Sequence, residues 1–221
     1  EAVLENSKDS RRRAEVFEIR LSSLIARNRP ASAVDLALEV LPEYGVELPR
    51  NPTEAEIGGA LSGLLGELGA RSITDLATAP EMTDATALGA MSILTSIASA
   101  AYVAAPSLFP LVAIEQAKLS FRHGLTASSA FAMSVLGILF AGPVGDLDAA
   151  YACATTVEKI LDRVGPSSIE GRARYVATVY LRVWKHPVNE IWSLCPAIER
   201  RCLETGDLEF AAWAAMMRVK H

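Results

Sequence analysis

The sequence has no surplus of basic residues. Its 221 residues include 21 Lys and Arg against 26 Asp and Glu, which gives a net charge of -5. Nucleic-acid binding depends on clustered Lys and Arg that release counterions from the phosphates, and an acidic chain repels that backbone. The one basic cluster, Arg11–Arg13, is interpreted as the solvated start of a helix, with a contact to an acidic neighbouring domain as the alternative. We therefore expect no nucleic-acid partner.

Aromatic residues are scarce, at 6%, while hydrophobic residues make up 51% and charged residues 21% of the chain. The high hydrophobic share excludes the disordered class. Ala and Leu dominate the hydrophobic residues, whereas sandwiches and barrels depend on Val, Ile, Thr and aromatic side chains. The composition therefore predicts an all-α fold of closely packed helices.

Cysteine is limited to three residues, Cys153, Cys195 and Cys202. An odd number of cysteines in apolar helical stretches indicates free thiols in a reducing compartment. Cys195 and Cys202 lie two helical turns apart, about 10 Å along the axis, which is too far for a disulfide. We interpret all three as core residues, with redox or metal chemistry as the alternative.

Charge is absent from two long stretches, residues 85–114 and 125–145. Their length alone permits two membrane spans. The first stretch is interrupted by Pro106 and Pro110, and neither stretch is flanked by an Arg/Lys cluster or an aromatic belt. We therefore favour buried helices of a cytoplasmic protein over membrane spans.

A signal peptide and an initiator Met are also missing, because the chain begins with the acidic segment Glu1–Glu5. Its last residues, Arg218–His221, continue a helix without a stop signal. We therefore expect the chain to be a segment of a larger protein.

Turn and cap residues divide the chain into helices, and no segment has the pattern of a strand of convincing length. A capping box is predicted at Thr53 and Glu56, because this spacing lets each side chain accept a hydrogen bond from the other residue's backbone. The predicted helices cover residues 9–27, 30–44, 53–69, 84–104, 106–123, 126–141, 146–164, 167–185, 187–205 and 207–221, with a short helical turn over 74–79.

Three of the predicted helices end at glycines spaced 41 residues apart, Gly124, Gly165 and Gly206. Glycine is favoured at helix C-termini because it adopts a left-handed backbone conformation at little cost. A helix–turn–helix unit that recurs at this period is typical of repeat proteins, whose units stack to bury a shared core. We therefore predict an α-solenoid of antiparallel helix pairs, with about ten to eleven helices.

The whole chain, residues 1–221, is predicted to form a single helical-repeat domain. Its parts are a first helix pair (1–45), a linker with irregular helices (46–83), three stacked helix pairs (84–206) and the first helix of a truncated further repeat (207–221).

Residues in the fourth predicted helix pair resemble a tetratricopeptide repeat. Leu136, Gly137 and Phe140 resemble the small and aromatic contact residues of the first repeat helix. Ala149 resembles the small contact residue of the second helix. A later pair departs from the pattern, because Glu190 stands where a small residue is expected. The resemblance implies a tetratricopeptide-like solenoid.

Five further segments occur in a recognisable order: Ala26–Ala33, Leu41–Pro49, Pro52–Glu56, Met82–Asp84 and Arg122–Gly124. Together they resemble the repeat region of large bacterial signalling proteins that carry a predicted AAA-type ATPase module. In that family a serine/threonine kinase domain often precedes the ATPase, and GAF and sensor histidine-kinase domains often follow the repeats. The resemblance implies a scaffold in signal transduction whose parent protein carries the ATPase and kinase activities elsewhere.

Motifs for catalysis and cofactor binding are missing. A phosphate-binding loop ends in Gly-Lys-Ser/Thr, and no such loop is present. Neither a His-x-x-x-His nor a Cys-x-x-Cys spacing occurs, so no zinc site is predicted. Two carboxylate pairs, Glu54 with Glu56 and Asp146 with Asp148, lie in first helical turns, where negative charge offsets the helix dipole. We predict no catalytic, metal-binding or cofactor-binding residue and no enzyme activity in this segment.

Aromatic residues gather in the C-terminal third together with arginine. Trp, Tyr and Arg dominate interface energetics, and a solenoid presents such residues on a groove. The alternative is that these rings fill the core of the last helix pairs. We predict contacts with another protein or with neighbouring domains; the alternative function is a small-molecule sensor with a cavity within residues 85–142. The candidate partner-binding residues are Tyr175, Tyr180, Arg182, Trp184 and Trp192.

Overall fold

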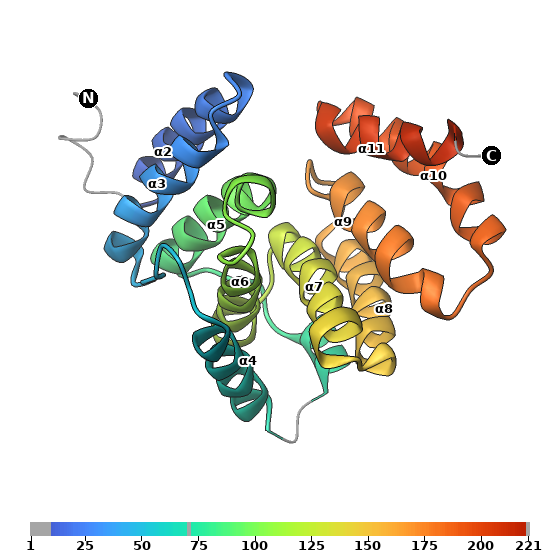
Figure 1. Cartoon of the computed structure of the whole chain (residues 1–221), viewed down its shortest axis with the longest axis horizontal. Helices are drawn as coiled ribbons and strands as arrows, with labels where there is room; N and C mark the ends of the chain where they lie inside the picture. Colours follow the sequence, from blue (N-terminus) through green and yellow to red (C-terminus); the bar gives the residue numbers. More distant parts are fainter. Residues whose placement is uncertain (1–9, 70–71, 220–221) are drawn as a thin grey trace. The chain divides into compact units, whose positions relative to one another are not determined.

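The computed structural model describes residues 10–69 and 72–219, and all regular secondary structure in this part of the chain is helical (Figure 1). The same two ranges contain no β-strand, which confirms the all-α prediction. The predictions for Glu1–Glu5 and for the last two residues, Lys220 and His221, lie outside the described residues.

Contacts between Cα atoms divide the chain into two compact units, each built from two stretches of sequence. Among the described residues, the first unit contains 10–69 and 80–124, and the second unit contains 72–79 and 125–219. The chain therefore contributes a short segment to the second unit before it completes the first.

The first unit consists of α2 (Ser10–Ala26), α3 (Pro30–Val40), the 3-10 turn η1 (Leu41–Tyr44), α4 (Glu54–Leu68), α5 (Ala85–Ala104) and α6 (Phe109–His123). Helix α5 is its centre, because α2, α3 and α6 all pack against it, while α4 packs against α6. One buried polar contact links α5 and α6: Nε2 of Gln116 donates a hydrogen bond to Oγ1 of Thr95 at 2.8 Å. This pairing avoids the cost of an unsatisfied buried donor.

The second unit consists of η2 (Ile73–Thr78), α7 (Ala127–Leu139), the π-helical turn η3 (Phe140–Val144), α8 (Leu147–Val164), α9 (Glu170–Val176), the π-helical turn η4 (Ala177–Leu181), the 3-10 turn η5 (Arg182–Trp184), α10 (Val188–Glu204) and α11 (Leu208–Val219). Helix α7 packs against α8 and α9, α9 packs against α10, and α10 packs against α11. The short η2 lies against α8, where Nη1 of Arg163 donates to the carbonyl oxygens of Ala77 and Ala79 at 3.0 and 2.5 Å.

The predicted caps are present at several helix ends. Thr53 and Glu56 form the capping box, with each side chain accepting from the other residue's amide. All three glycines of the 41-residue spacing have positive φ: 102° at Gly124, 76° at Gly165 and 76° at Gly206. At Gly124 and Gly165 ψ is close to 180°, a conformation that only glycine adopts readily. The helix ends were thus predictable from local sequence.

Two predicted helix starts are wrong. Helix α6 begins at Phe109 and not at Pro106, because Ala105 leaves the helical conformation (φ −144°, ψ 64°) and a turn precedes the new helix. Helix α9 begins at Glu170, and no side chain caps its start. The sequence offers two candidate caps for this helix, Ser167 and Ser168; the Ser167 hydroxyl is buried without a hydrogen-bond partner among the described residues.

The helix predicted over 167–185 is not a continuous α-helix. Its α-helical part ends at Val176, and a π-helical turn, η4, and a 3-10 turn, η5, follow it. The helix predicted to end at Ala141 likewise continues into the π-helical turn η3, which accommodates Pro143. Such changes of hydrogen-bond register widen or tighten a helix locally, and π-helical turns are frequent at functional sites.

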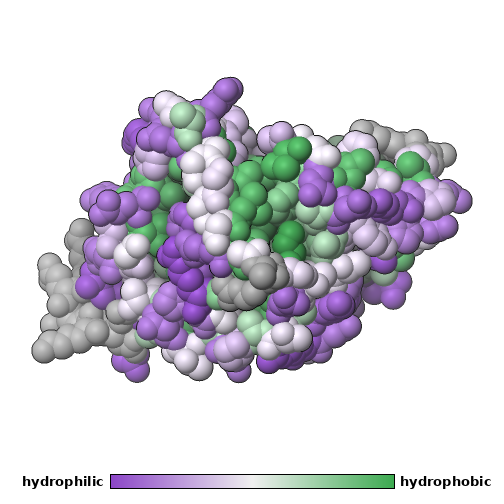
Figure 2. All heavy atoms as spheres, turned by 90° about the horizontal axis from the view of Figure 1, so that it is seen from below, coloured by the Kyte–Doolittle hydropathy of each residue, from purple (hydrophilic) through white to green (hydrophobic). Residues whose placement is uncertain are grey.

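Two helical stretches, Ala85–Ala104 and Ala127–Val144, are long and apolar enough to cross a membrane by length and composition. Within the structure, 61% of each stretch is buried against other helices, as is common for core helices. The remaining apolar surface is not fully covered: Tyr102 and Val103 of α5 are exposed, and Figure 2 shows hydrophobic residues at the surface beside hydrophilic ones.

Candidate functional site

Two adjoining depressions on the second unit form the candidate site. They lie along α10, and Arg182 and Leu194 line both of them. We call their combined surface the Arg182 groove. The larger depression, about 400 Å³, is lined by Glu158, Arg174, Thr178, Arg182, Leu194, Ala197, Ile198 and Arg201. The smaller one, about 290 Å³, is lined by Arg182, His186, Glu190, Ile191, Ser193 and Leu194.

The π-helical turn η4 positions the residues at the base of the groove. It carries Thr178, and Arg182 follows directly after it at the start of η5. Both residues line the larger depression. Because a π-helical turn inserts a residue into the helical register, η4 changes which side chains of this segment face the groove. A continuous α-helix over the same residues would present a different set.

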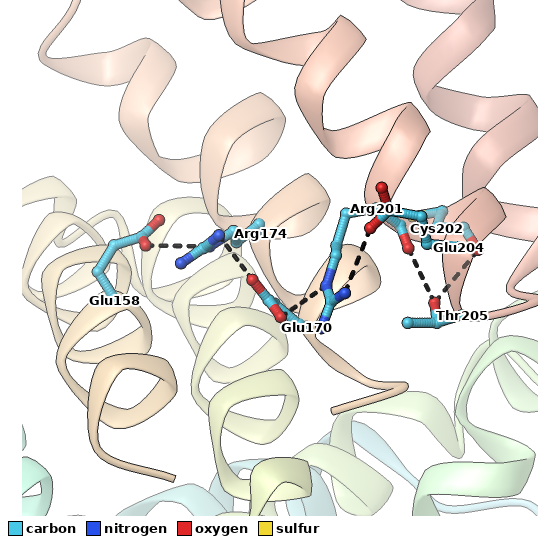
Figure 3. A network of polar contacts seen from close by, with 7 residues as sticks. All are labelled: Glu158, Glu170, Arg174, Arg201, Cys202, Glu204 and Thr205. Carbon is cyan, nitrogen blue, oxygen red and sulfur yellow. Dashed lines mark hydrogen bonds and ion pairs between the residues drawn. The ribbon is translucent and has the colours of Figure 1, made fainter. Parts of the chain in front are cut away.

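An ion-pair chain crosses one part of the groove from α8 over α9 to α10 (Figure 3). Arg174 pairs with Glu158 at 3.2 Å and with Glu170 at 2.7 Å. Glu170 also pairs with Arg201 at 2.7 Å, and Arg201 pairs with Glu204 at 3.3 Å. The positive charges of Arg174 and Arg201 are therefore compensated within the second unit.

Arg182 differs from these two arginines, because its side chain forms no hydrogen bond or ion pair with any residue in the described ranges. It is half-buried, and it is the one residue of η5 that lines the groove. A guanidinium group offers five N–H donors in a planar arrangement that matches a carboxylate. Arg182 thus supplies an uncompensated positive charge and several donors at the centre of the groove.

A polar cluster borders the smaller depression. The hydroxyl of Tyr151 lies 3.0 Å from Nε2 of His186. The two rings are tilted by 34° to each other, and their centroids are 5.6 Å apart. Nδ1 of His186 lies 3.4 Å from a carboxylate oxygen of Glu190. These contacts connect α8 with the turn before α10, and they fix the imidazole at the end of the groove.

The structure separates the five candidate residues that were grouped from the sequence. Arg182 lines the groove, and Tyr180 and Trp184 are exposed, at 43% and 52%. Trp192 is half-buried. Tyr175 is only 2% exposed and packs edge-to-face against Phe210 at 5.7 Å, so it belongs to the core. Burial raises the pKa of the Tyr175 hydroxyl, and no described residue hydrogen-bonds to it.

Sequence analysis missed the wall that α10 contributes. Leu194, Ala197, Ile198 and Arg201 recur at intervals of three and four residues, so they share one face of α10 and all line the groove. The spacing was visible in the sequence, but the same pattern is typical of a face buried in a core. Only the position of α9 and η4 shows that this face borders a groove.

Another arginine near the aromatic cluster has a structural role. Nε of Arg172 donates to Oδ2 of Asp207 at 2.7 Å, and the guanidinium lies over the rings of Phe131 and Phe210. The Asp207 carboxylate is almost fully buried and also accepts a hydrogen bond from the amide of Phe210 at 3.4 Å, so it caps the start of α11. Arg172 therefore joins α7, α9 and α11 and is not available to a partner.

All three cysteines are free and buried. Burial raises the pKa of each thiol, most clearly for Cys153, and raises the pKa of Cys202 to about 11. Thiols in this state are poor nucleophiles and metal ligands, because both roles require the thiolate. Within residues 10–69 and 72–219 no group of three or more His, Cys, Asp or Glu side chains is arranged to hold a metal ion.

Comparisons with known proteins do not assign the chain to a family. The chain matches no protein-family model, no curated protein and no solved structure.

Proposed function

We propose that this segment is a non-catalytic helical-repeat scaffold of a bacterial signal-transduction protein. It would mediate contacts with another protein, or between an ATPase module and the kinase or sensor output of its parent protein in the cytoplasm. The observation that carries the proposal is the Arg182 groove, where an uncompensated guanidinium lies beside the exposed Leu194. Arginine and large apolar residues next to a depression are typical of protein-binding surfaces.

The spacing of the helix ends supports the repeat part of the proposal. Gly124, Gly165 and Gly206 each follow a helix and have positive φ. Between the last two glycines lie α9 and α10, which pack against each other, and between the first two lie α7 and α8, which do the same. An α-solenoid of tetratricopeptide-like pairs would account for both the period and these contacts.

The sensor hypothesis placed a ligand cavity within residues 85–142. Both depressions of the Arg182 groove are formed by residues 158–201, so they do not support that hypothesis. The sensor hypothesis stays a prediction, and the partner-capture experiment described next also tests it.

The test is capture of a partner from the soluble extract of the source cell, with the whole chain as bait. The retained protein is identified, purified and titrated against the chain by calorimetry. We expect Trp184→Ala to weaken binding by about tenfold or more, because exposed tryptophans at interfaces often contribute over about 1.4 kcal/mol. Trp213→Ala is the matched control, since Trp213 is an exposed tryptophan of α11, whereas Trp184 is exposed in the same short turn, η5, as the groove residue Arg182.

Two outcomes would contradict the proposal. If Trp213→Ala abolishes binding while Trp184→Ala retains it, the partner binds elsewhere. If no protein is retained but a small molecule co-purifies and raises the melting temperature, the sensor hypothesis replaces the scaffold.

A further inference from the structure

The unpaired guanidinium of Arg182 favours an anionic ligand group. Three guanidinium groups line the larger depression, and the pairing described above leaves Arg182 as the one without a partner in the described ranges. Arg182 is therefore the point in the groove that can pair with a negative group.

Arg182 carries a single unpaired positive charge, which favours a monoanionic carboxylate over a dianionic phosphate. Carboxylates line both depressions, Glu158 the larger one and Glu190 the smaller one. They repel a dianion more strongly than a monoanion. One carboxylate with two oxygens matches one guanidinium in a bidentate pair. A single Asp or Glu side chain is thus the group that fits.

The apolar surface beside Arg182 favours a peptide. Leu194 lines both depressions and is still exposed, as is Trp184, two residues after Arg182. From Glu190 to Arg201 the wall formed by α10 rises about 16 Å at ~1.5 Å per residue, which equals the length of about five residues in an extended chain. Covering Leu194 with an apolar side chain would remove its surface from water.

We infer that the Arg182 groove binds a short extended protein segment that presents one Asp or Glu side chain to Arg182 and an apolar side chain to Leu194. This inference rests on the proposed scaffold function and specifies the chemistry of its partner. The acidic residue supplies orientation through the bidentate pair, and the apolar residue supplies buried area.

The test uses peptide pools of about seven residues, long enough to span the α10 wall. Their ends are acetylated and amidated so that only side chains carry charge. The central position is Glu, Gln or phosphoserine, and the flanking positions are random without charged residues or Cys. The whole chain is immobilised, and retained peptides are quantified and sequenced by mass spectrometry. We expect the Glu pool to be retained about tenfold better than the Gln pool, with apolar residues enriched beside the centre.

Two matched variants link this preference to the groove. Arg182→Gln removes the free cation and should abolish the preference for Glu over Gln. Arg200→Gln removes the same charge from an exposed position of α10 outside the groove. This variant should keep the preference for the Glu pool over the Gln pool. Circular dichroism confirms that both variants are folded.

Equal retention of the Glu and Gln pools, or a preference that persists in Arg182→Gln, would overturn the inference. Preferred retention of the phosphoserine pool would also overturn it, in favour of a phosphorylated partner. If a partner is captured through Trp184 while no pool shows a preference for Glu, the proposed scaffold function stands and only the acidic-peptide inference fails.

Discussion

Gly171 and Cys202 illustrate how single residues determine the contact between α9 and α10. A Cβ atom at position 171 would lie 2.4 Å from Sγ of Cys202 and 3.2 Å from its Cα and N atoms. Glycine therefore allows the two helices to approach closely, and the Cys202 thiol is enclosed by that approach. The thiol is a packing group, and its high pKa follows from its enclosure, with the nearby Asp207 as the smaller cause.

This environment predicts slow reaction of the thiols in the folded chain. At about pH 8 a thiol with a pKa near 11 is only about one-thousandth ionised. In the unfolded chain the same thiols ionise near their ordinary pKa, so stability should fall as the pH rises from about 9 towards 11. Titration with a chromogenic disulfide reagent should detect all three thiols rapidly in concentrated urea and almost none in native buffer.

The contrary result has a clear meaning. One thiol that reacts as fast in the folded chain as in urea would favour the redox alternative over packing. A parallel measurement of the urea midpoint against pH checks the direction of the pH dependence.

At the scale of elements, Glu170 connects α9 with α10. Its side chain is only 14% exposed and pairs at 2.7 Å with Arg174 of its own helix and with Arg201 of α10. Exposed ion pairs contribute about 0–1 kcal/mol, and enclosure raises the contribution. We therefore expect Glu170→Gln to lower the free energy of unfolding by about 1 kcal/mol, measured by urea unfolding at low salt.

Salt and a matched variant distinguish this effect from lost packing. The loss of unfolding free energy caused by Glu170→Gln should shrink at about 1 M NaCl, because salt screens partly exposed ion pairs. Glu204→Gln removes the same charge from a side chain that is 53% exposed and should change stability less. A salt-independent loss in Glu170→Gln would show that the ion pairs are not its cause.

The comparison of sequence with structure also belongs to this scale. Helix ends at Thr53, Asp84, Gly165 and Asp207 were predictable, because caps act through residues close in sequence. The π-helical turn η4 was not, since its residues match the local pattern of a continuous helix, and its packing against α7, α8 and α10 depends on residues distant in the sequence. The Arg182 groove could not be predicted either, because it also depends on how elements distant in the sequence pack against each other.

At the scale of the whole molecule, Arg163 connects η2 to the rest of the second unit. Its guanidinium donates to two carbonyl groups, of Ala77 and Ala79, at the end of that segment. We expect Arg163→Ala to increase amide hydrogen exchange in residues 73–78 by about three- to tenfold, as the loss of such hydrogen bonds predicts. Mass spectrometry of proteolytic peptides measures this directly.

Lys159→Ala is the control for this prediction. Lys159 is exposed on α8, one turn before Arg163, and forms no hydrogen bond or ion pair with another described residue. Its replacement should leave exchange in residues 73–78 unchanged. Equal acceleration in both variants would mean that α8 as a whole had loosened and that Arg163 has no specific role.

The position of η2 within the sequence has a consequence for synthesis. Arg163 follows Ala77 by 86 residues. At a translation rate of about 5–20 residues per second, the segment waits about 4–17 s for its partner helix to be made. During this interval the η2 residue Leu76, which is buried in the finished chain, lacks the helix α8 against which η2 packs. Helices α5 and α6 are made within the same interval, so the nascent chain can complete the first unit while its apolar η2 segment remains open to chaperones.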